Sequence, residues 1–414
     1  MPNCRKSTYR VVVVVEKGIA APNIMLDFAA AFEELGHPVF LIDFRLLETM
    51  ASDEEKIAYF ENIRKELKHF EPDFAVGYGN SVFISLPPND PERHFFEEME
   101  INYISLFFDN PLLTGFISSM LTLHSPRYTV FIWDRNHLAE FRRQHKKEAF
   151  YLPLATNPKV FRPLAPEPEF EADVSFIGSV STTADYDLER IQNGWHEWLV
   201  GFARNIVDAV RRHPGVTVTE IIHAFRDGFP DETRKALDDF SRQDDYTSFL
   251  LSLYDEIGAR DRMDAIRLLP DDLRVHVYGG PGWNRLSKPG LHLKGPVDYH
   301  RMAPLVYNSA RINLNVTGSQ LSAAVNQRVF DVAACGAFLL TDYRTALDEL
   351  FDVGRDVACY RNLNELKQLT DYYRGLPDLR LEIAARGRQR VLAEHTYCHR
   401  AQRIIDLFQY RASY

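Results

Sequence analysis

The chain has 414 residues, 45% of them hydrophobic and 26% charged, and it carries a formal net charge of −10 at pH 7. This length exceeds what one ordinary hydrophobic core supports, so we expect two folded domains. The acidic balance argues against nucleic acid or an anionic membrane as the main partner, because both would require a basic surface.

The chain also lacks the patterns of membrane and secreted proteins. Its early apolar run, 11–15, is too short for a signal peptide, and no stretch approaches the roughly 20 apolar residues of a membrane-spanning helix. We therefore expect a cytoplasmic protein without a transmembrane segment. The cysteines show no C-x-x-C spacing and predict neither a disulfide nor a zinc site; they are Cys4, Cys335, Cys359 and Cys398.

The first 160 residues alternate apolar strands with amphipathic helices, which predicts a doubly wound α/β domain. In an open parallel sheet the carboxyl ends of the strands share one edge, so the polar residues that follow the strands should gather there. The expected helices are 23–35 and 56–69, and the expected strands are 9–15, 39–44, 74–76, 104–108, 129–133 and 149–152.

Five prolines between Pro153 and Pro168 interrupt regular structure and are typical of a linker. We therefore expect a first domain at 1–160 and a second at 170–395. The second begins with a strand at 173–177, and the following residues, about 185–269, have few strand signals and predict a helical insertion. Strands resume at 274–278 and 292–294.

The segment 311–342, RINLNVTGSQLSAAVNQRVFDVAACGAFLLTD, has the pattern of a strand, a loop, a helix and a second strand. Ser322 is the expected helix cap and Gly336 the expected end of the helix. Free backbone N–H groups and the helix dipole at such a helix start favour an anion, and Arg328 adds a permanent positive charge. Beyond a strand at 357–360 we expect two helices from Leu363 onward, and the segment 396–414 is long enough to cross back onto the first domain.

Several motifs in this order resemble the CgeB-like glycosyltransferases, a branch of the two-Rossmann, or GT-B, glycosyltransferases. The second half carries VYGGPGW, LKGPVDY, LNVTG, VNQRVFDVAACGAFLLTD and AARGRQRVLAEHTYCHR, and the first half adds FFDNP, FIWD and YLPLATNP. The resemblance implies two Rossmann-like domains that face a central cleft. It also implies transfer of a sugar from a nucleotide-diphosphate-sugar to an acceptor, with no metal and no other cofactor.

One position departs from the pattern of related retaining enzymes, which carry two glutamates eight positions apart around this helix. The second glutamate matches Asp331, whereas the first falls on Ala323. The sequence therefore does not predict whether the configuration of the sugar is retained or inverted.

The donor site is expected at the strand ends of the second domain. Cations and N–H groups must stabilise a diphosphate leaving group when no metal does so, which favours Arg328 with the helix start at Ser322. Each assignment has an ordinary structural alternative: a surface ion pair for Arg328, a helix cap for Asp331, and a tight turn for the glycines. The candidate donor-binding residues are Gly178 and Ser179 for phosphate, Gly280 and Trp283 for the base, and Asn315, Ser322, Asn326, Arg328 and Asp331.

The acceptor site is expected in the first domain. If configuration is inverted, a base must reach the attacking hydroxyl; Asp109, at the end of a strand, is the first candidate and Glu16 the second. A turn aspartate is the alternative for Asp109. Gly18 and Asn80 follow other strands and are assigned to the acceptor side. No G-x-G-x-x-G pattern follows Gly18, which counts against a dinucleotide oxidoreductase, and no D-x-D or H-E-x-x-H motif predicts a metal.

These observations predict a cytoplasmic, metal-independent, hexosyltransferase-like enzyme whose partners are a nucleotide-sugar and an acceptor of unspecified chemistry. Two alternatives stay open: a catalytically silent nucleotide-sugar-binding protein, and a nucleotide-sugar epimerase of the same architecture. The sequence does not indicate an oligomeric state.

Overall fold

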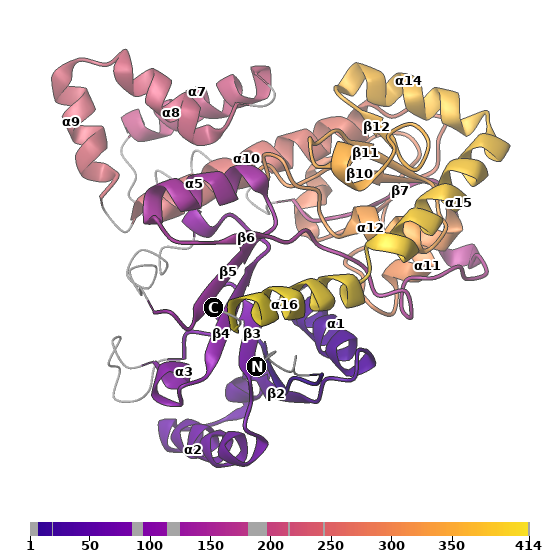
Figure 1. The fold of residues 1–414 in the computed structure, drawn as a ribbon. Helices are drawn as coiled ribbons and strands as arrows, with labels where there is room; N and C mark the ends of the chain where they lie inside the picture. The colour runs from indigo at the N-terminus through magenta and orange to yellow at the C-terminus, as the bar shows by residue number, and fades with distance from the viewer. Residues whose placement is uncertain are drawn as a thin grey trace. The chain divides into compact units, whose positions relative to one another are not determined.

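The computed structural model describes residues 7–18, 20–84, 94–113, 125–180, 197–213, 216–242 and 245–412. These residues form two compact units (Figure 1). The first unit takes the described residues of 7–112, 125–159 and 391–412, and the second takes Val160–Arg390 together with Leu113. The chain thus passes from the first unit to the second inside the proline-rich segment.

A parallel sheet of six strands forms the centre of the first unit, in the order β2-β1-β3-β4-β5-β6. The five valines of β1 are completely buried because helices cover both faces of the sheet at this strand. The strands are β1 (Val11–Val15), β2 (Val39–Asp43), β3 (Phe74–Tyr78), β4 (Asn102–Phe107), β5 (Tyr128–Ile132) and β6 (Phe150–Tyr151).

Five helices of this unit lie within its described residues: α1 (Ala21–Glu34), α2 (Asp53–Phe70), α3 (Phe95–Glu98), α5 (Arg135–His145) and α16 (Tyr397–Ala412). The sequence pattern did not predict α5, whose apolar face is narrow; the Asp134 carboxylate caps its start by accepting from two backbone N–H groups. α16 packs on α1, with the Tyr397 ring 5.0 Å from the Phe28 ring. The last described residues, those of α16, therefore belong to the first unit.

A second parallel sheet of six strands forms the centre of the second unit, in the order β12-β11-β10-β7-β8-β9. The strand order reverses between β7 and β10, and such a switch point is where open α/β sheets bind ligands. The strands are β7 (Ala172–Ile177), β8 (Val275–Tyr278), β9 (Leu291–Leu293), β10 (Ala310–Asn315), β11 (Leu339–Asp342) and β12 (Ala358–Tyr360).

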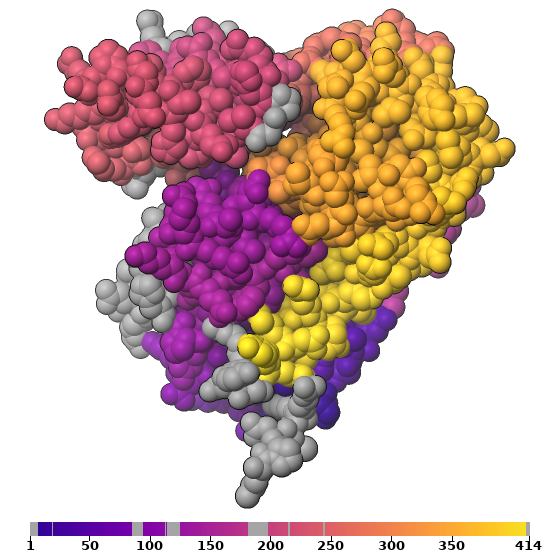
Figure 2. All heavy atoms as spheres, turned by 45° about the horizontal axis from the view of Figure 1, so that its top comes forward, coloured from indigo at the N-terminus to yellow at the C-terminus, as the bar shows by residue number. Residues whose placement is uncertain are grey.

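The described residues between β7 and β8 include four helices: α7 (Glu197–Arg212), α8 (Val218–Asp227), α9 (Asp231–Phe240) and α10 (Asp245–Leu268). They share a hydrophobic core of their own, to which α10 contributes Phe249 and Leu253. The other end of α10 contributes Ala265 and Ile266 to the core under the sheet. α10 therefore joins the insertion to the sheet, and Figure 2 shows side chains of the insertion, pink to red, from outside.

The remaining helices correct two expectations. They are α11 (Ala303–Ser309), α12 (Arg328–Ala334), α13 (Leu347–Leu350), α14 (Leu363–Arg374) and α15 (Pro377–Glu394). The helix expected from Ser322 begins only at Arg328, so Ser322 is not its cap, whereas its end at Gly336, with φ +66°, is confirmed. Three helices, not two, follow Leu363, because Gly375 and Pro377 separate α14 from α15.

In the loop after β8, residues Pro281–Arg285 form a 3-10 turn. A Cβ atom on Gly279 would lie 2.3 Å from Gly178 O, whereas one on Gly280 would meet nothing closer than Ser179 Oγ at 3.9 Å.

We expect Gly279→Ala to lower the free energy of unfolding by about 1–3 kcal/mol and Gly280→Ala to be neutral or slightly stabilising. Urea unfolding of both variants tests this, and equal losses would contradict the packing.

None of the helices in the described ranges combines the length and the apolar character that a membrane span needs. The two parallel sheets with their helices confirm the expected α/β class with two Rossmann-like parts. Glu16 and Gly178 follow strands β1 and β7 at the carboxyl edges of the two sheets.

Candidate functional site

The carboxyl ends of β7 and β10 form the centre of the site in the second unit. These neighbouring strands pair in parallel, with Phe176 opposite Leu314, and their loops diverge at the switch point. Gly178 and Ser179 continue from β7, as the sequence predicted. A Cβ atom on Gly178 would lie only 2.9 Å from the Phe176 ring, so glycine is required there for packing.

Arg328, the first residue of α12, reaches back to the end of β10. Its Nε donates to Asn315 Oδ1 at 2.8 Å, and its Nη2 donates to Val316 O at 3.5 Å. Its Nη1 lies 4.0 Å from the position that a Cβ atom on Gly178 would occupy. The structure therefore brings Arg328 and Gly178 together, and burial lowers the pKa of the guanidinium.

A second arginine, which the sequence analysis missed, lies in the same place. Arg262 projects from α10 and donates from Nη1 to Ser179 O at 2.5 Å. Burial and the like charge of Arg328 lower the pKa of Arg262 to about 10. Arg262 comes from the middle of a charged helical run, where no local pattern distinguishes it from solvent-exposed arginines.

Neither guanidinium group forms a close ion pair, although Asp342 and other aspartates act on both at longer range. Within the described part of the chain, neither Arg262 nor Arg328 has a carboxylate oxygen within 4.0 Å. The nearby Asp342 accepts from Thr317 N and Oγ1, both at 2.8 Å, and from Arg344 Nε at 3.0 Å. Because like charges at close range raise each other's energy, this arrangement favours a bound anion.

The position of Trp283 contradicts its predicted role in base stacking. Its side chain is 1% exposed and packs edge-on against Phe176, with ring centroids 5.5 Å apart. Its Nε1 donates to Gly178 O at 2.8 Å. Trp283 is therefore part of the core that supports the Gly178 turn. The neighbouring Gly280 does lie at the site, where its N–H donates to Ser179 Oγ at 3.4 Å.

Asn315 and Asp331 also lie below the site surface. Asn315 is 1% exposed, and its Nδ2 donates to Thr341 Oγ1 at 2.9 Å while its Oδ1 accepts from Arg328. Asp331 is completely buried and accepts from Tyr299 Oη at 2.6 Å. Direct donor contacts by Asn315 and Asp331 stay predictions; in this structure Asn315 holds Arg328, and Asp331 holds Tyr299.

Asn326 and Ser322 lie in the loop between β10 and α12. Asn326 Nδ2 donates to Asn315 Oδ1 at 3.1 Å, so Asn326 and Arg328 hold the same oxygen atom. Ser322 is half-buried in this irregular loop, and Ala323 is buried, with its carbonyl oxygen accepting from Ala346 N at 3.0 Å. A donor contact by Ser322 stays a prediction.

The first unit gathers the predicted acceptor-side residues at its carboxyl edge. Glu16 follows β1, Asn80 follows β3, and Asp109 follows β4. The hydroxyl of Tyr78 donates to the Asp109 carboxylate, and burial together with the Asp109 charge raises the pKa of Glu16 to about 7. Gly18 has φ +139°, a conformation that favours glycine. The two predicted base candidates therefore lie near enough to interact.

The raised pKa of Glu16 predicts a pH-dependent stability. The folded chain keeps the Glu16 proton up to about pH 7, whereas the unfolded chain loses it near the ordinary glutamate pKa of 4.5. The contribution of Glu16 to the free energy of unfolding is therefore fully present below pH 4.5 and is lost as pH rises through about 7. We expect Glu16→Gln to match the wild type at about pH 4.5 and to unfold at a higher temperature at about pH 8. Thermal unfolding across pH measures this, and parallel profiles would contradict the raised pKa.

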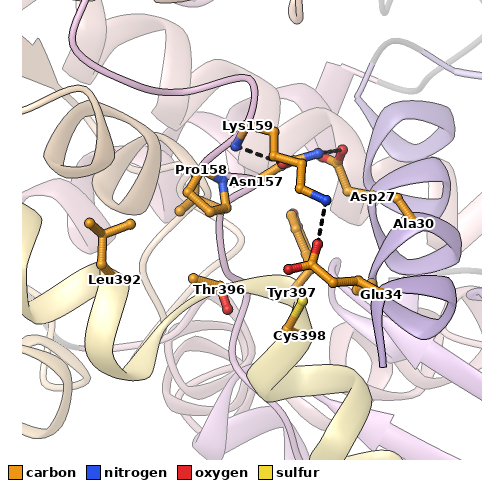
Figure 3. A pocket seen from close by; sticks show the side chains of 12 residues that line it. Asp27, Ala30, Glu34, Asn157, Pro158, Lys159, Leu392, Thr396, Tyr397 and Cys398 are labelled. Carbon is orange, nitrogen blue, oxygen red and sulfur yellow. Dashed lines mark hydrogen bonds and ion pairs between the residues drawn. The ribbon is translucent and has the colours of Figure 1, made fainter. Parts of the chain in front are cut away.

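A pocket of about 240 Å³ lies elsewhere in the first unit, between α1 and the start of α16 (Figure 3). Two side-chain pairs cross it: Lys159 Nζ with Glu34 Oε2 at 2.5 Å, and Asn157 Nδ2 with Asp27 Oδ1 at 2.7 Å. None of the residues predicted from the sequence lines this pocket. The side chains of these two pairs are matched within the unit, and we assign the pocket no chemistry.

No cluster of three or more His, Cys, Asp or Glu side chains that could hold a metal occurs in the described ranges. Metal-independent chemistry stays a prediction. The cationic side chains at the switch point are suited to an anion of the size of a diphosphate, because two separated guanidinium groups can contact separate phosphate groups.

Comparison with known proteins agrees with this architecture. Residues 260–406 match the family described as "Glycosyl transferase-like", and no curated protein matches the chain. Similar solved structures include a glycosyltransferase from Rickettsia africae, with TM-score 0.57, 11% identity, and 98% of this chain and 99% of that chain covered. Another is sucrose-phosphate synthase from Thermosynechococcus elongatus, with TM-score 0.55 and 10% identity over 99% of this chain and 100% of that chain.

A third similar structure is HepE from Anabaena in complex with UDP and glucose, with TM-score 0.54 and 9% identity over 96% of this chain and 99% of that chain. At such identities the similarity establishes the fold. The chain therefore has the GT-B fold that the sequence predicted, and residues 260–406 carry the glycosyl transferase-like sequence pattern.

Proposed function

We propose that the protein transfers a sugar from a nucleotide-diphosphate-sugar to a hydroxyl-bearing acceptor. The observation that carries this proposal is the pair of arginines without carboxylate contacts, Arg262 and Arg328, at the β7/β10 switch point. The match of residues 260–406 to the glycosyl transferase-like family supports the same reaction class. The second unit would bind the donor and the first the acceptor.

The two guanidinium groups would hold the diphosphate and stabilise the charge that develops as it leaves. A charged hydrogen bond to a phosphate oxygen strengthens as the bond to the sugar breaks, which lowers the barrier. The seven residues of α12 contribute less than a long helix would, so the charges of the side chains must supply most of this stabilisation.

The carboxylates of the first unit would activate the acceptor. If the configuration is inverted, Asp109 or Glu16 would take the proton of the acceptor hydroxyl while the hydroxyl oxygen forms the new bond to the anomeric carbon. The bond from that carbon to the diphosphate would break at the same time, releasing the nucleoside diphosphate. A base with a pKa near 7, as burial and Asp109 give Glu16, suits catalysis at neutral pH.

The finer features are part of the same proposal: a CgeB-like enzyme, a hexose as the transferred sugar, activity without metal, and a cytoplasmic location. The HepE structure was solved with UDP-glucose, so this donor is the first to test. The alternative is a catalytically silent nucleotide-sugar-binding protein, which Ala323 favours because it stands where related retaining enzymes carry the first of their two glutamates.

Incubation of the purified protein with UDP-glucose, GDP-mannose, ADP-glucose or dTDP-glucose and a panel of hydroxyl acceptors tests the proposal. Release of free nucleoside diphosphate that depends on the acceptor would support a transferase. Thermal stabilisation without release would support the silent binder, and conversion of the donor to an isomer would support an epimerase. The absence of both turnover and binding with every donor would overturn the proposal.

A further inference from the structure

The side-chain oxygen of Asn326 is a buried hydrogen-bond acceptor beside Arg328, and no described residue pairs with it. Asn326 is 6% exposed, and its Oδ1 has no hydrogen-bond partner among the residues that the structure describes. Burying an amide oxygen without a partner is costly, and most such groups in folded proteins are satisfied by protein, ligand or water.

The orientation of this amide follows from its neighbours. Arg328 Nε can only donate, so the Asn315 atom that it contacts at 2.8 Å must be the acceptor Oδ1. The Asn326 atom that contacts the same Oδ1 at 3.1 Å must then be a donor, which is Nδ2. Exchanging the two ends of the Asn326 amide would place two acceptors against each other. The unpartnered atom is therefore the oxygen.

This oxygen lies next to the proposed diphosphate contact. Asn326 and Arg328 are joined through a single atom, Asn315 Oδ1, and Asn315 is held in turn by Thr341 Oγ1 at 2.9 Å. The rigid support fixes the distance between the guanidinium and the unpartnered oxygen. In a nucleotide-sugar, hydroxyl groups flank the diphosphate on both sides, on the ribose and on the sugar.

We propose that Asn326 Oδ1 accepts a hydrogen bond from a hydroxyl group of the bound nucleotide-sugar and so determines donor specificity. This inference rests on the proposed function and adds the recognition of one hydroxyl to it. A site built to receive a hydroxyl rejects the analogue that lacks it, because the oxygen is then left buried and unpaired. The hydroxyl belongs either to the ribose or to the sugar.

Calorimetric titration of the wild type and Asn326→Ala tests the inference. The first probes are four pairs: UDP with UDP-glucose, GDP with GDP-mannose, ADP with ADP-glucose, and dTDP with dTDP-glucose. For each pair that binds, we then titrate analogues that lack one hydroxyl group of the ribose or of the sugar. One analogue should bind the wild type about 3- to 10-fold more weakly than its parent, and Asn326→Ala should show no such difference.

The outcomes of this titration show whether the hydroxyl belongs to the ribose or to the sugar, and whether this inference or the proposed function is wrong. A difference for a ribose analogue identifies the ribose, and one for a sugar analogue identifies the sugar. Wild-type protein that binds a parent and all its analogues equally would overturn this inference and leave the proposed function standing. Wild-type protein that binds none of the four pairs would overturn both.

A control variant, Asn313→Ala, distinguishes recognition of a donor hydroxyl from a role in stabilising the fold. Asn313 is 2% exposed in the same strand region, but its amide is satisfied: Nδ2 donates to Tyr307 O at 3.0 Å and Oδ1 accepts from Ser175 Oγ at 2.7 Å. Asn313→Ala should lower the unfolding temperature and keep the preference for the hydroxyl. Loss of that preference in Asn313→Ala as well as in Asn326→Ala would contradict a specific role of Asn326 Oδ1.

Discussion

Replacing Arg328 by alanine should weaken the binding of a nucleoside diphosphate by about 100-fold, because at least one charge-assisted contact to phosphate is lost from a half-buried site. The fold should persist. Asn315 Oδ1, which loses Arg328 as a donor, keeps the hydrogen bond from Asn326 Nδ2. Calorimetric titration with the nucleoside diphosphate of the donor that binds, combined with thermal unfolding, measures both effects.

Two further variants make this result specific. Arg262→Ala should also weaken binding, and because the two arginines act on one anion, the loss in the double variant should differ from the sum of the single losses. Arg311→Ala is the control, since Arg311 lies on β10 in an exposed ion pair with Asp173 at 2.8 Å. Unchanged affinity in Arg328→Ala, or equal losses in Arg328→Ala and Arg311→Ala, would refute the diphosphate site.

The sequence predicted the sheets well because strand and helix periodicity are local signals. The buried valines of β1 and the alternation of apolar residues in β10 each occupy a few consecutive positions. The cap of α12 was predicted at Ser322, five residues before the observed cap, Gln327. Ser322 has the residue type of a cap, but the loop that it belongs to is held by contacts such as Ala323 O with Ala346 N, which are distant in sequence.

In the candidate site, too, residues in local sequence patterns were predicted and residues placed by distant contacts were not. Arg328 was predicted because it stands in a recognisable βαβ pattern, whereas Arg262 reaches the site only through the packing of α10 against the loop after β7. Trp283 was assigned to the site because it follows a glycine-rich strand end. Its side chain turns into the core instead, because the close approach of Gly279 to Gly178 leaves Nε1 within hydrogen-bond distance of Gly178 O.

The second large expected effect is on the turnover rate, and it concerns Asp109 in the first unit. Asp109→Asn should lower kcat by about 100- to 10,000-fold while the dissociation constant of the donor stays unchanged, because a general base acts on the acceptor and not on the diphosphate. The Tyr78 hydroxyl donates to the Asp109 carboxylate and would orient it in the wild type. Glu48→Gln is a control, since Glu48 is an exposed carboxylate paired with Lys17 at 2.7 Å. A near-normal rate in Asp109→Asn would show that the base lies elsewhere.

The pH profile decides between the two carboxylates. If Glu16 takes the proton, kcat/KM of the wild type should rise as pH passes about 7, where Glu16 loses its own proton, and Glu16→Gln should abolish turnover. If Asp109 takes it, Glu16→Gln should retain turnover and lose the rise near that pH, because the neighbouring charge that appears there is gone. A rise that persists unchanged in Glu16→Gln would assign the titration to a group outside this pair.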